Sequence, residues 1–319
     1  MYRSRCKETL VQKYAVFTGS CQSLPAIQYL LQSNKLGCVV LVDAEPNPDL
    51  AQLQYWLQQN NIQVVAYNQA DDSRVLARLD ELAINRALVY MFRHKLRDKL
   101  IQYFGGYLVN LHPSPLPEYR GPFPLYWQLR NGEEVTKLTI HRVTESIDDG
   151  DIAVDVDIEI HPFDTMNSLQ QKVAQVVPYL IDTFCQLDEQ QKLSWHKQAE
   201  HAHNSAPALT EQQLMVNWYQ QTAKQVVNMA RAGNVDSGCA IFAVGRDMFQ
   251  LLQASIVECH LAGLQPGTVI EVDRHQGLLI KTKDAAVRFD VIGTQHGLFD
   301  GYRFAVLFGL EAGMSLSDI

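Results

Sequence analysis

Short apolar runs alternate with helix-like segments from residue 14 to residue 109, and this alternation constrains the fold more than any other feature. Between the runs, apolar residues recur at helical spacing, as in Val75, Leu79 and Leu82. Strands that alternate with helices at this spacing predict βαβ units and a parallel sheet. We therefore expect an α/β fold with an open, Rossmann-like, mostly parallel sheet and helices on both faces. The apolar runs are 14–17, 38–42, 64–67, 87–92 and 107–109.

The composition and the apolar pattern of the sequence change after about residue 186. Residues 186–210 are mostly polar, and short strand-like runs separated by turns such as Pro266-Gly267 follow from residue 240. This pattern predicts a small β-barrel of the OB-like kind. We expect an extension over 1–12, an α/β catalytic domain over 13–190, a linker over 191–209 and a C-terminal β-barrel domain over 210–319. The predicted strands of the barrel are 240–244, 249–257, 268–272, 278–282 and 286–292.

Two segments before the linker have a distinct periodicity. Residues 152–160 alternate strictly between apolar and acidic, which predicts a half-exposed strand that is antiparallel or lies at a sheet edge. A helix is expected after Asp164 or Thr165, and Pro178 within it predicts a kink or a late start.

Charge and cysteine content narrow the class of protein. The formal net charge is −8, and the parts before and after residue 206 carry −5 and −3, so neither is a basic module of the kind that binds nucleic acid. The six cysteines show no metal-binding spacing, and we expect reduced thiols and no metal. No signal peptide or membrane span is evident. We expect a cytoplasmic protein without a membrane partner.

The stretch from Tyr107 to Gly121 carries the first candidate chemistry. Its strand ends in Asn110 and His112, which lie two residues apart and so point to the same side. Asp148 follows 36 residues later on an acidic turn. A carboxylate and an imidazole form an acid–base pair, and an asparagine amide can donate to a developing oxyanion. The alternatives at this point are an ordinary strand exit and a solvated acidic turn.

The first strand ends at Thr18-Gly19-Ser20, just before a predicted helix. Such a turn can hold an anionic ligand at the helix N-terminus. It contains neither GxGxxG nor GxxxxGK[ST], so a purely structural turn is the alternative.

The stretches LVNLHPSPLPEYRGPFPLYWQLRNGE and LTIHRVTESIDDGDI resemble the folate-dependent formyltransferase family. The family pattern is Asn-x-His-x-Ser-x-Leu-Pro-x-Tyr-Arg-Gly, then Pro three residues on, and later Asp-x-Gly. So many positions at fixed spacing favour the catalytic interpretation over both alternatives for Asn110, His112 and Asp148. The resemblance covers residues 80–170, and the layout with Asn217-Trp218 in a second domain is similar to methionyl-tRNA formyltransferase. The matching residues are Asn110, His112, Ser114, Leu116, Pro117, Tyr119, Arg120, Gly121, Pro124, Asp148 and Gly150.

The resemblance implies roles for these positions. The formyl donor would be 10-formyltetrahydrofolate, Asn110 and His112 would polarise the formyl oxygen, and Asp148 would pair with His112 and move protons. The bond between Leu116 and Pro117 is expected to be cis. The folate would contact, largely through the main chain, Tyr90, Met91, Phe92, Arg93, His94, Leu96, Val143, Thr144, Glu145 and Ile147. The acceptor would contact Thr18, Gly19, Ser20, Tyr119 and Arg120.

The departures from the family bear on the acceptor. Residues 42–49 are acidic where methionyl-tRNA formyltransferases carry a basic loop, which argues against tRNA. The segment 138–142, with His141, looks more like the domain that formylates a UDP-linked amino-arabinose. We expect an N-formyltransferase for a small primary amine, on an amino-sugar nucleotide or a natural-product intermediate. The alternatives are a methionyl-tRNA formyltransferase, a formyltetrahydrofolate hydrolase and a non-enzymatic relative. A homodimer is compatible with the sequence, which does not determine the oligomeric state.

Overall fold

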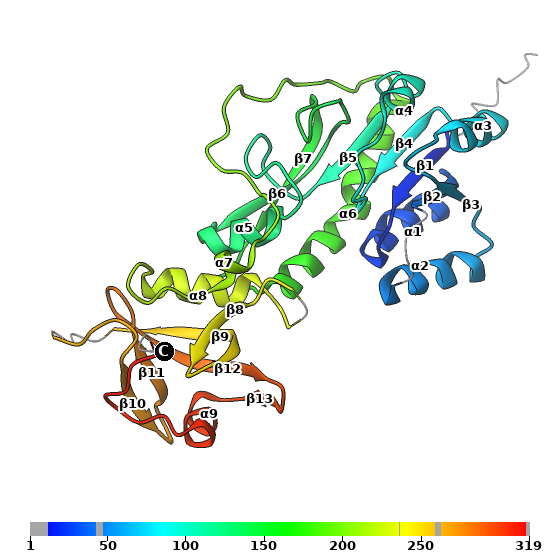
Figure 1. Ribbon diagram of the computed structural model, residues 1–319. Coiled ribbons are helices and arrows are strands. Elements are labelled where there is room, and N and C mark those ends of the chain that lie inside the picture. The colour runs from blue at the N-terminus through cyan, green and yellow to red at the C-terminus, as the bar shows by residue number, and fades with distance from the viewer. Residues whose placement is uncertain (1–11, 43–46, 236, 259–262, 317–319) are drawn as a thin grey trace, which may run out of the picture. The chain divides into compact units, whose positions relative to one another are not determined.

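The computed structural model describes residues 12–42, 47–235, 237–258 and 263–316 (Figure 1). The chain forms two compact units, each assembled from separate stretches of sequence. The first unit comprises 1–120, 137–158 and 172–204, and the second comprises 121–136, 159–171 and 205–319. The predicted extension over 1–12 falls outside the described residues except for Gln12, and residues 43–46 of the acidic stretch 42–49 also fall outside them.

The first unit is organised around a seven-stranded sheet with the order β3-β2-β1-β4-β5-β6-β7. Strands β1 to β5 pair in parallel, whereas β6 is antiparallel to β5. Strands β1, β2 and β3 follow one another toward one edge of the sheet. Strand β4 pairs with the other side of β1, and β5 to β7 follow toward the opposite edge, so the strand order reverses between β1 and β4. The alternating strand β7 lies at the sheet edge, as its sequence predicted. The strands are β1 (Tyr14–Thr18), β2 (Leu36–Val42), β3 (Val64–Tyr67), β4 (Arg86–Val89), β5 (Leu108–His112), β6 (Val135–Arg142) and β7 (Ile152–Glu159).

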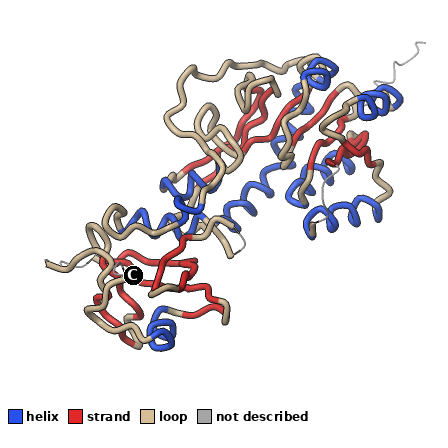
Figure 2. Tube along the Cα trace, in the orientation of Figure 1, coloured by secondary structure: helices blue, strands red, loops and turns tan. Residues whose placement is uncertain are grey.

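Helices lie on both faces of this sheet (Figure 2). Both faces are apolar, and successive side chains of a strand point to opposite faces. Ala15 and Phe17 of β1 share a buried cluster with apolar residues of α3 and α4. On the opposite face Tyr14 meets residues of α1 and α6, among them Leu30 and Ile181. The predicted α/β fold class is thus confirmed. The helices of this part of the chain are η1 (Cys21–Ser23), α1 (Leu24–Gln32), α2 (Pro48–Gln59), α3 (Ser73–Glu81), α4 (Asp98–Tyr103) and α6 (Met166–Glu189).

Two predictions about the ends of elements can be compared with the structure. Helix α6 begins at Met166, directly after the two predicted caps, and runs through Pro178, so of the kink and the late start that this proline predicted, the late start is wrong. Its buried residues recur at helical spacing on both sides of the proline, which keeps the helix continuous. Strand β4 ends at Val89 rather than at residue 92, because Met91 takes a positive φ of 57° and turns the chain out of the sheet.

The second unit combines helices with an antiparallel sheet in the order β10-β11-β12-β9-β8, to which β13 adds beside β12. This antiparallel β domain confirms the predicted second architecture. The sequence missed the short β13 and the helix α9 that follows it. The elements are α5 (Pro124–Asn131), α7 (Glu211–Leu214), α8 (Ala223–Ala232), β8 (Ala240–Val244), β9 (Asp247–Val257), β10 (Val269–Asp273), β11 (Gly277–Lys281), β12 (Ala286–Thr294), β13 (Gly297–Phe299) and α9 (Gly301–Phe308).

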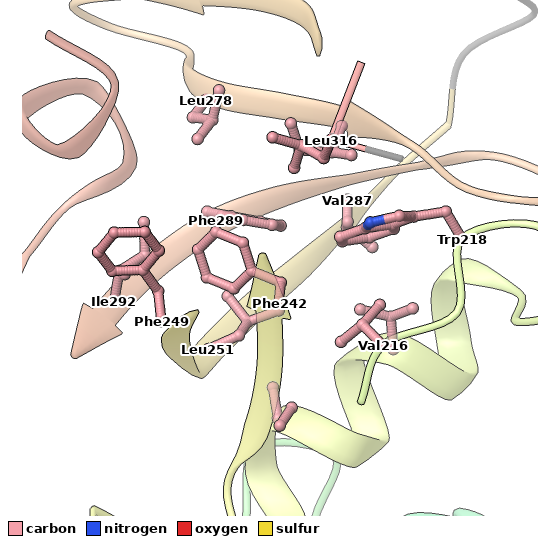
Figure 3. Packing of buried hydrophobic residues seen from close by; sticks show 14 of the residues in the cluster. Val216, Trp218, Phe242, Phe249, Leu251, Leu278, Val287, Phe289, Ile292 and Leu316 are labelled. Carbon is pink, nitrogen blue, oxygen red and sulfur yellow. The ribbon is translucent and has the colours of Figure 1, made fainter. Parts of the chain in front are cut away.

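Aromatic side chains form the centre of the second unit. Phe242 of β8 contacts Phe289 of β12 edge to face at 4.9 Å, and the indole of Trp218 stacks on Phe289 at 6.0 Å (Figure 3). Phe304 of α9 closes the cluster 5.6 Å from Phe242. Aromatic pairs prefer such offset and edge-to-face arrangements, and burial of large rings stabilises a small β domain.

Candidate active site

The end of β5 places Asn110 and His112 at the carboxyl edge of the sheet. β5 pairs in parallel with β4, where Asn110 lies opposite Val89, and antiparallel with β6, where Asn110 lies opposite His141. The carboxyl edge of a parallel sheet near a reversal of strand order is where α/β enzymes bind their ligands. Both side chains therefore start from a rigid strand rather than from a loop.

Asp148 comes from the turn after β6 and meets both residues. Its Oδ2 is 3.7 Å from His112 Nδ1, and its Oδ1 accepts a hydrogen bond of 3.3 Å from Asn110 Nδ2. The other ring nitrogen of His112, Nε2, is 3.0 Å from the carbonyl oxygen of Tyr119. Both ring nitrogens thus face acceptor oxygens. The structure brings the three predicted catalytic residues together.

The structure adds His141, which was singled out only as part of a resemblance and not as a site residue. Its Nε2 is 3.1 Å from Asn110 Nδ2, and its Nδ1 is 2.8 Å from the carbonyl oxygen of Arg142. Burial, followed by the neighbouring His112, lowers the pKa of His141 to about 4. The ring is then neutral near pH 7, with Nδ1 donating to the carbonyl and Nε2 accepting from Asn110. Only the pairing of β5 with β6 reveals this contact, because the two residues are far apart in sequence.

The turn that carries Asp148 has a constrained backbone. Asp148 has a φ of 51°, which is uncommon for a residue other than glycine. A Cβ on Gly150 would lie 2.0 Å from the carbonyl oxygen of Arg142, so only glycine fits there. The Asp-x-Gly spacing therefore follows from the close approach of this turn to the end of β6.

The two ends of the predicted folate segment 90–96 are buried, and the residues between them are half-buried or exposed. Tyr90 and Leu96 are buried, and burial raises the pKa of Tyr90 to about 12. Phe92 packs edge to face against Phe17 at 5.8 Å and lies 5.7 Å from the ring of His94. Arg93 is exposed. The main chain of this segment and the side chains of Arg93 and His94 are therefore what this edge can offer to a ligand.

The second predicted folate segment runs from Val143 to Ile147. Val143 is tied to β5, because its N–H donates to the carbonyl of Leu108 at 2.9 Å. Thr144 donates from its hydroxyl to the carbonyl of Ser146 at 3.1 Å. Glu145 is exposed, and Ile147 has 66% of its surface exposed although it is apolar. An exposed isoleucine beside Asp148 is available to contact an apolar ring.

The backbone N–H groups at the predicted acceptor turn already have hydrogen-bond acceptors within the protein. The N–H of Gly19 donates to the carbonyl of Met91 at 3.1 Å, and the N–H of Ser20 donates to the hydroxyl of Thr18 at 3.4 Å. The N–H of Cys21 donates to the carboxylate of Asp49 at 3.0 Å. A carboxylate therefore already stands at this helix N-terminus, where an anionic ligand would otherwise bind.

Tyr119 and Arg120 follow the cis bond between Leu116 and Pro117, which the sequence predicted. Tyr119 is buried with a φ of 60°. The guanidinium of Arg120 pairs with Asp149 at 2.7 Å and donates to Gln198 at 2.6 Å. Arg120 thus contacts the turn that carries Asp148.

Within the described residues, no group of three or more His, Cys, Asp or Glu side chains has the geometry of a metal site. Among the same residues, none of the helices combines the length and apolar character that a membrane crossing requires.

The doubly wound sheet and the polar set at its edge define an α/β enzyme of the group-transfer type, and the comparisons identify its family. The family described as Formyl transferase matches residues 12–181, and Formyl transferase, C-terminal domain, matches residues 208–297. The chain therefore belongs to the formyl transferase family of enzymes.

Curated relatives include methionyl-tRNA formyltransferases. The one from Pseudothermotoga lettingae is 28% identical over 211 residues, which cover 65% of this chain and 67% of that protein. The one from Thermotoga maritima is 29% identical over 179 residues, which cover 56% of each. The matched region thus spans little more than half of the second relative.

Solved structures share the fold at low identity. HypX from Aquifex aeolicus in complex with tetrahydrofolic acid has a TM-score of 0.57 and 17% identity, covering 92% of this chain and 47% of HypX. An N-formyltransferase from Helicobacter canadensis in complex with folinic acid and dTDP-3-aminofucose has a TM-score of 0.62 and 17% identity, covering 88% of this chain and 98% of that one.

Proposed function

We propose that this protein is an N-formyltransferase that moves a formyl group from 10-formyltetrahydrofolate to the primary amine of a small metabolite. The observation that carries the proposal is the convergence of Asn110, His112 and Asp148 at the carboxyl edge of the sheet in a chain of the formyl transferase family. No nucleophilic side chain is part of this set, which suits direct transfer to a nucleophile that the acceptor supplies.

Each residue has a distinct role in the transfer. As the acceptor nitrogen forms its bond to the formyl carbon, negative charge develops on the formyl oxygen. One N–H of the Asn110 amide and one N–H of the His112 ring then leave their present acceptors and donate to this oxygen. Asp148 accepts the proton that the attacking amine loses. The formyl group then leaves the N10 nitrogen of the folate, which takes up a proton as the bond breaks. The products are a formamide and tetrahydrofolate.

His141 has a supporting role in this proposal. Its neutral Nε2 accepts from the Asn110 amide and so restrains the rotation of that amide. Because the pKa of His141 is lowered to about 4, its ring is uncharged near pH 7 and Nε2 remains an acceptor. An amide that is already oriented in this way needs less reorganisation when the oxyanion forms.

The folate would lie against the two segments that flank the catalytic set. The main chain of residues 90–96, with Arg93 and His94 at its surface, would hold the pterin, together with the turn from Val143 to Ile147. Two solved structures of the same fold, in complex with tetrahydrofolic acid and with folinic acid, support a folate as the ligand. The acceptor would enter past Thr18, Gly19 and Ser20 and the backbone of Tyr119.

The acceptor class rests on charge and on the structural relatives. The N-formyltransferase from Helicobacter canadensis is complexed with dTDP-3-aminofucose, which supports an amino sugar carried on a nucleotide. The carboxylate of Asp49 accepts from the N–H of Cys21, directly after the turn 18–20, and so disfavours a phosphate there. Any nucleotide would therefore bind elsewhere on the enzyme.

A methionyl-tRNA formyltransferase is the second candidate, because the curated relatives have that activity. The net charges of −5 and −3 on the two parts of the chain disfavour it, since binding to a phosphate backbone requires clustered cations.

The test is a transfer assay with purified protein and 10-formyltetrahydrofolate against amino-sugar nucleotides, ornithine-like amines and charged initiator tRNA. We expect formylation of a small amine and no retardation of tRNA at low salt. Formylated methionyl-tRNA as the sole product would establish the second candidate instead. Formate released at the same rate with and without an amine would indicate a hydrolase.

Active-site variants test the roles of the residues. His112→Ala and Asp148→Asn should abolish transfer while folate binding persists, because the folate is held by other segments. The matched controls are His201→Ala and Asp157→Asn, which alter exposed side chains. Wild-type turnover by either active-site variant would contradict the proposal.

A further inference from the structure

The polar stretch that was expected to be only a linker contacts the catalytic turn. Residues 195–198 pass beside the start of β7, where His196 and Ile152 exchange two backbone hydrogen bonds of 2.8 and 2.9 Å. This pairing brings the side chain of Gln198 under the turn from Asp148 to Gly150. All of these residues belong to the first unit.

Gln198 uses both ends of its amide. Its Nε2 donates to the carbonyl oxygens of Asp148 and Gly150, both at 2.8 Å. Its Oε1 accepts from the Nε of Arg120 at 3.0 Å and from the Nη2 at 2.6 Å. Arg120 Nη2 also pairs with Asp149 Oδ1 at 2.7 Å. The turn is therefore bound by a glutamine on its backbone and by an arginine on its side chain.

The turn needs such support because its backbone is strained. Asp148 has a φ of 51°, in the region that L-residues rarely adopt, and a strained backbone persists only when its surroundings hold it. On one side the turn is anchored to β6, where the N–H of Arg142 donates to the carbonyl of Asp151 at 2.9 Å. On the other side Gln198 bonds the two carbonyls that flank the tip.

We propose that Gln198 and Arg120 form a positioning clamp that sets the Asp148 carboxylate against His112 and Asn110. Neither residue needs to touch the substrates, because both act through the turn. The inference rests on the proposed formyltransferase function and deepens it. It also gives the polar segment 195–198 a function in catalysis and assigns Arg120 to the support of Asp148.

The central test replaces the glutamine amide. Gln198→Leu removes both donors and the acceptor at similar volume, and Gln198→Glu keeps an acceptor for Arg120 but faces the two carbonyls with a carboxylate. Lys197→Ala is the matched control, because Lys197 is the exposed neighbour. A displacement of about 1 Å of a catalytic group can cost about 100-fold in rate. We expect both Gln198 variants to lower kcat by about 10- to 100-fold, with KM for 10-formyltetrahydrofolate changed by less than about threefold.

A second readout does not depend on turnover. The imidazole ¹⁵N chemical shifts of His112 at fixed pH report the proximity of the Asp148 carboxylate. They should change in Gln198→Leu and Gln198→Glu and stay unchanged in Lys197→Ala. If the wild-type protein formylates no amine, the proposed function fails, and these shifts still test the clamp.

Three results would overturn the clamp. The first is a Gln198→Leu enzyme with the kcat and the His112 shifts of Lys197→Ala. The second is a Gln198→Glu enzyme with wild-type kcat, because the donor bonds to the turn would then be dispensable. The third is a parallel loss of Tm, folate affinity and kcat in both variants, which would show a general structural role.

Discussion

Acidification should destabilise the first unit through His141 in particular. The imidazole is 1% exposed, and burial lowers its pKa from 6.5 to about 4. An unfolded chain binds a proton at this residue below pH 6.5, whereas the folded chain stays neutral until about pH 4. The folded state therefore loses stability as the pH falls through this window. At 1.36 kcal/mol per pKa unit, the full loss attributable to His141 is about 3 kcal/mol.

The measurement compares wild type with His141→Gln, which cannot titrate at this position. Because a chain of two units is not expected to unfold in one step, the unfolding of the first unit must be followed separately. Trp56 and Trp195 lie in this unit, and labelling with 5-fluorotryptophan allows ¹⁹F NMR to follow them during denaturation. Titrating groups far from His141 behave alike in both proteins, so their effects cancel in the difference. His112 and Asp148 interact with His141, so the difference reports the titration of this set of three groups.

We expect the stability of wild type relative to His141→Gln to fall by about 1.4 kcal/mol per pH unit between pH 6.5 and 4. Above pH 6.5 the difference should be constant. A stability difference that does not change with pH, or a His141 imidazole that titrates above pH 6 by NMR, would refute the reasoning.

Three further predictions follow from close contacts. Gly150→Ala should remove most transfer activity in the formyl-transfer assay, because its Cβ would lie 2.0 Å from the carbonyl of Arg142, and wild-type kcat would show that the turn can move aside. Asp188→Ala should destabilise the first unit by about 3–5 kcal/mol in denaturant, because it leaves the buried guanidinium of Arg86 without its 2.5 Å partner, and a change under 1 kcal/mol would contradict this. Phe289→Ala should destabilise the second unit by about 3–5 kcal/mol while leaving the ¹⁹F signals of Trp56 and Trp195 native, and loss of both units together would show that they unfold as one.

The α/β layout could be predicted from the sequence because it depends on local patterns. Continuous apolar runs mark strands buried on both faces, and the helices between them carry apolar residues at helical spacing. The end of β4 was misplaced because the positive φ of Met91 leaves no trace in hydrophobicity. Helix α9 was missed because it begins two residues after β13, so its apolar residues follow those of the last strands without a polar segment between them.

The candidate catalytic residues were found through the spacing of a motif, whereas their neighbours were not. His141 contacts Asn110 only because β6 runs antiparallel to β5 in one particular register. Gln198 lies in a polar stretch that looked like a linker, and its contact with the turn at Asp148 spans 50 residues. Neither contact has a local signature.

The sequence by itself thus predicted the alternation of strands and helices and the candidate residues Asn110, His112 and Asp148, because periodicity and motif spacing can be read along the chain. The tertiary structure alone decided what surrounds those residues: the neutral His141, the carboxylate of Asp49 at the turn 18–20, and the pair Arg120 and Gln198 under Asp148. The physical reason is that register, burial and the closure of distant segments set these contacts, and each depends on the whole chain being folded.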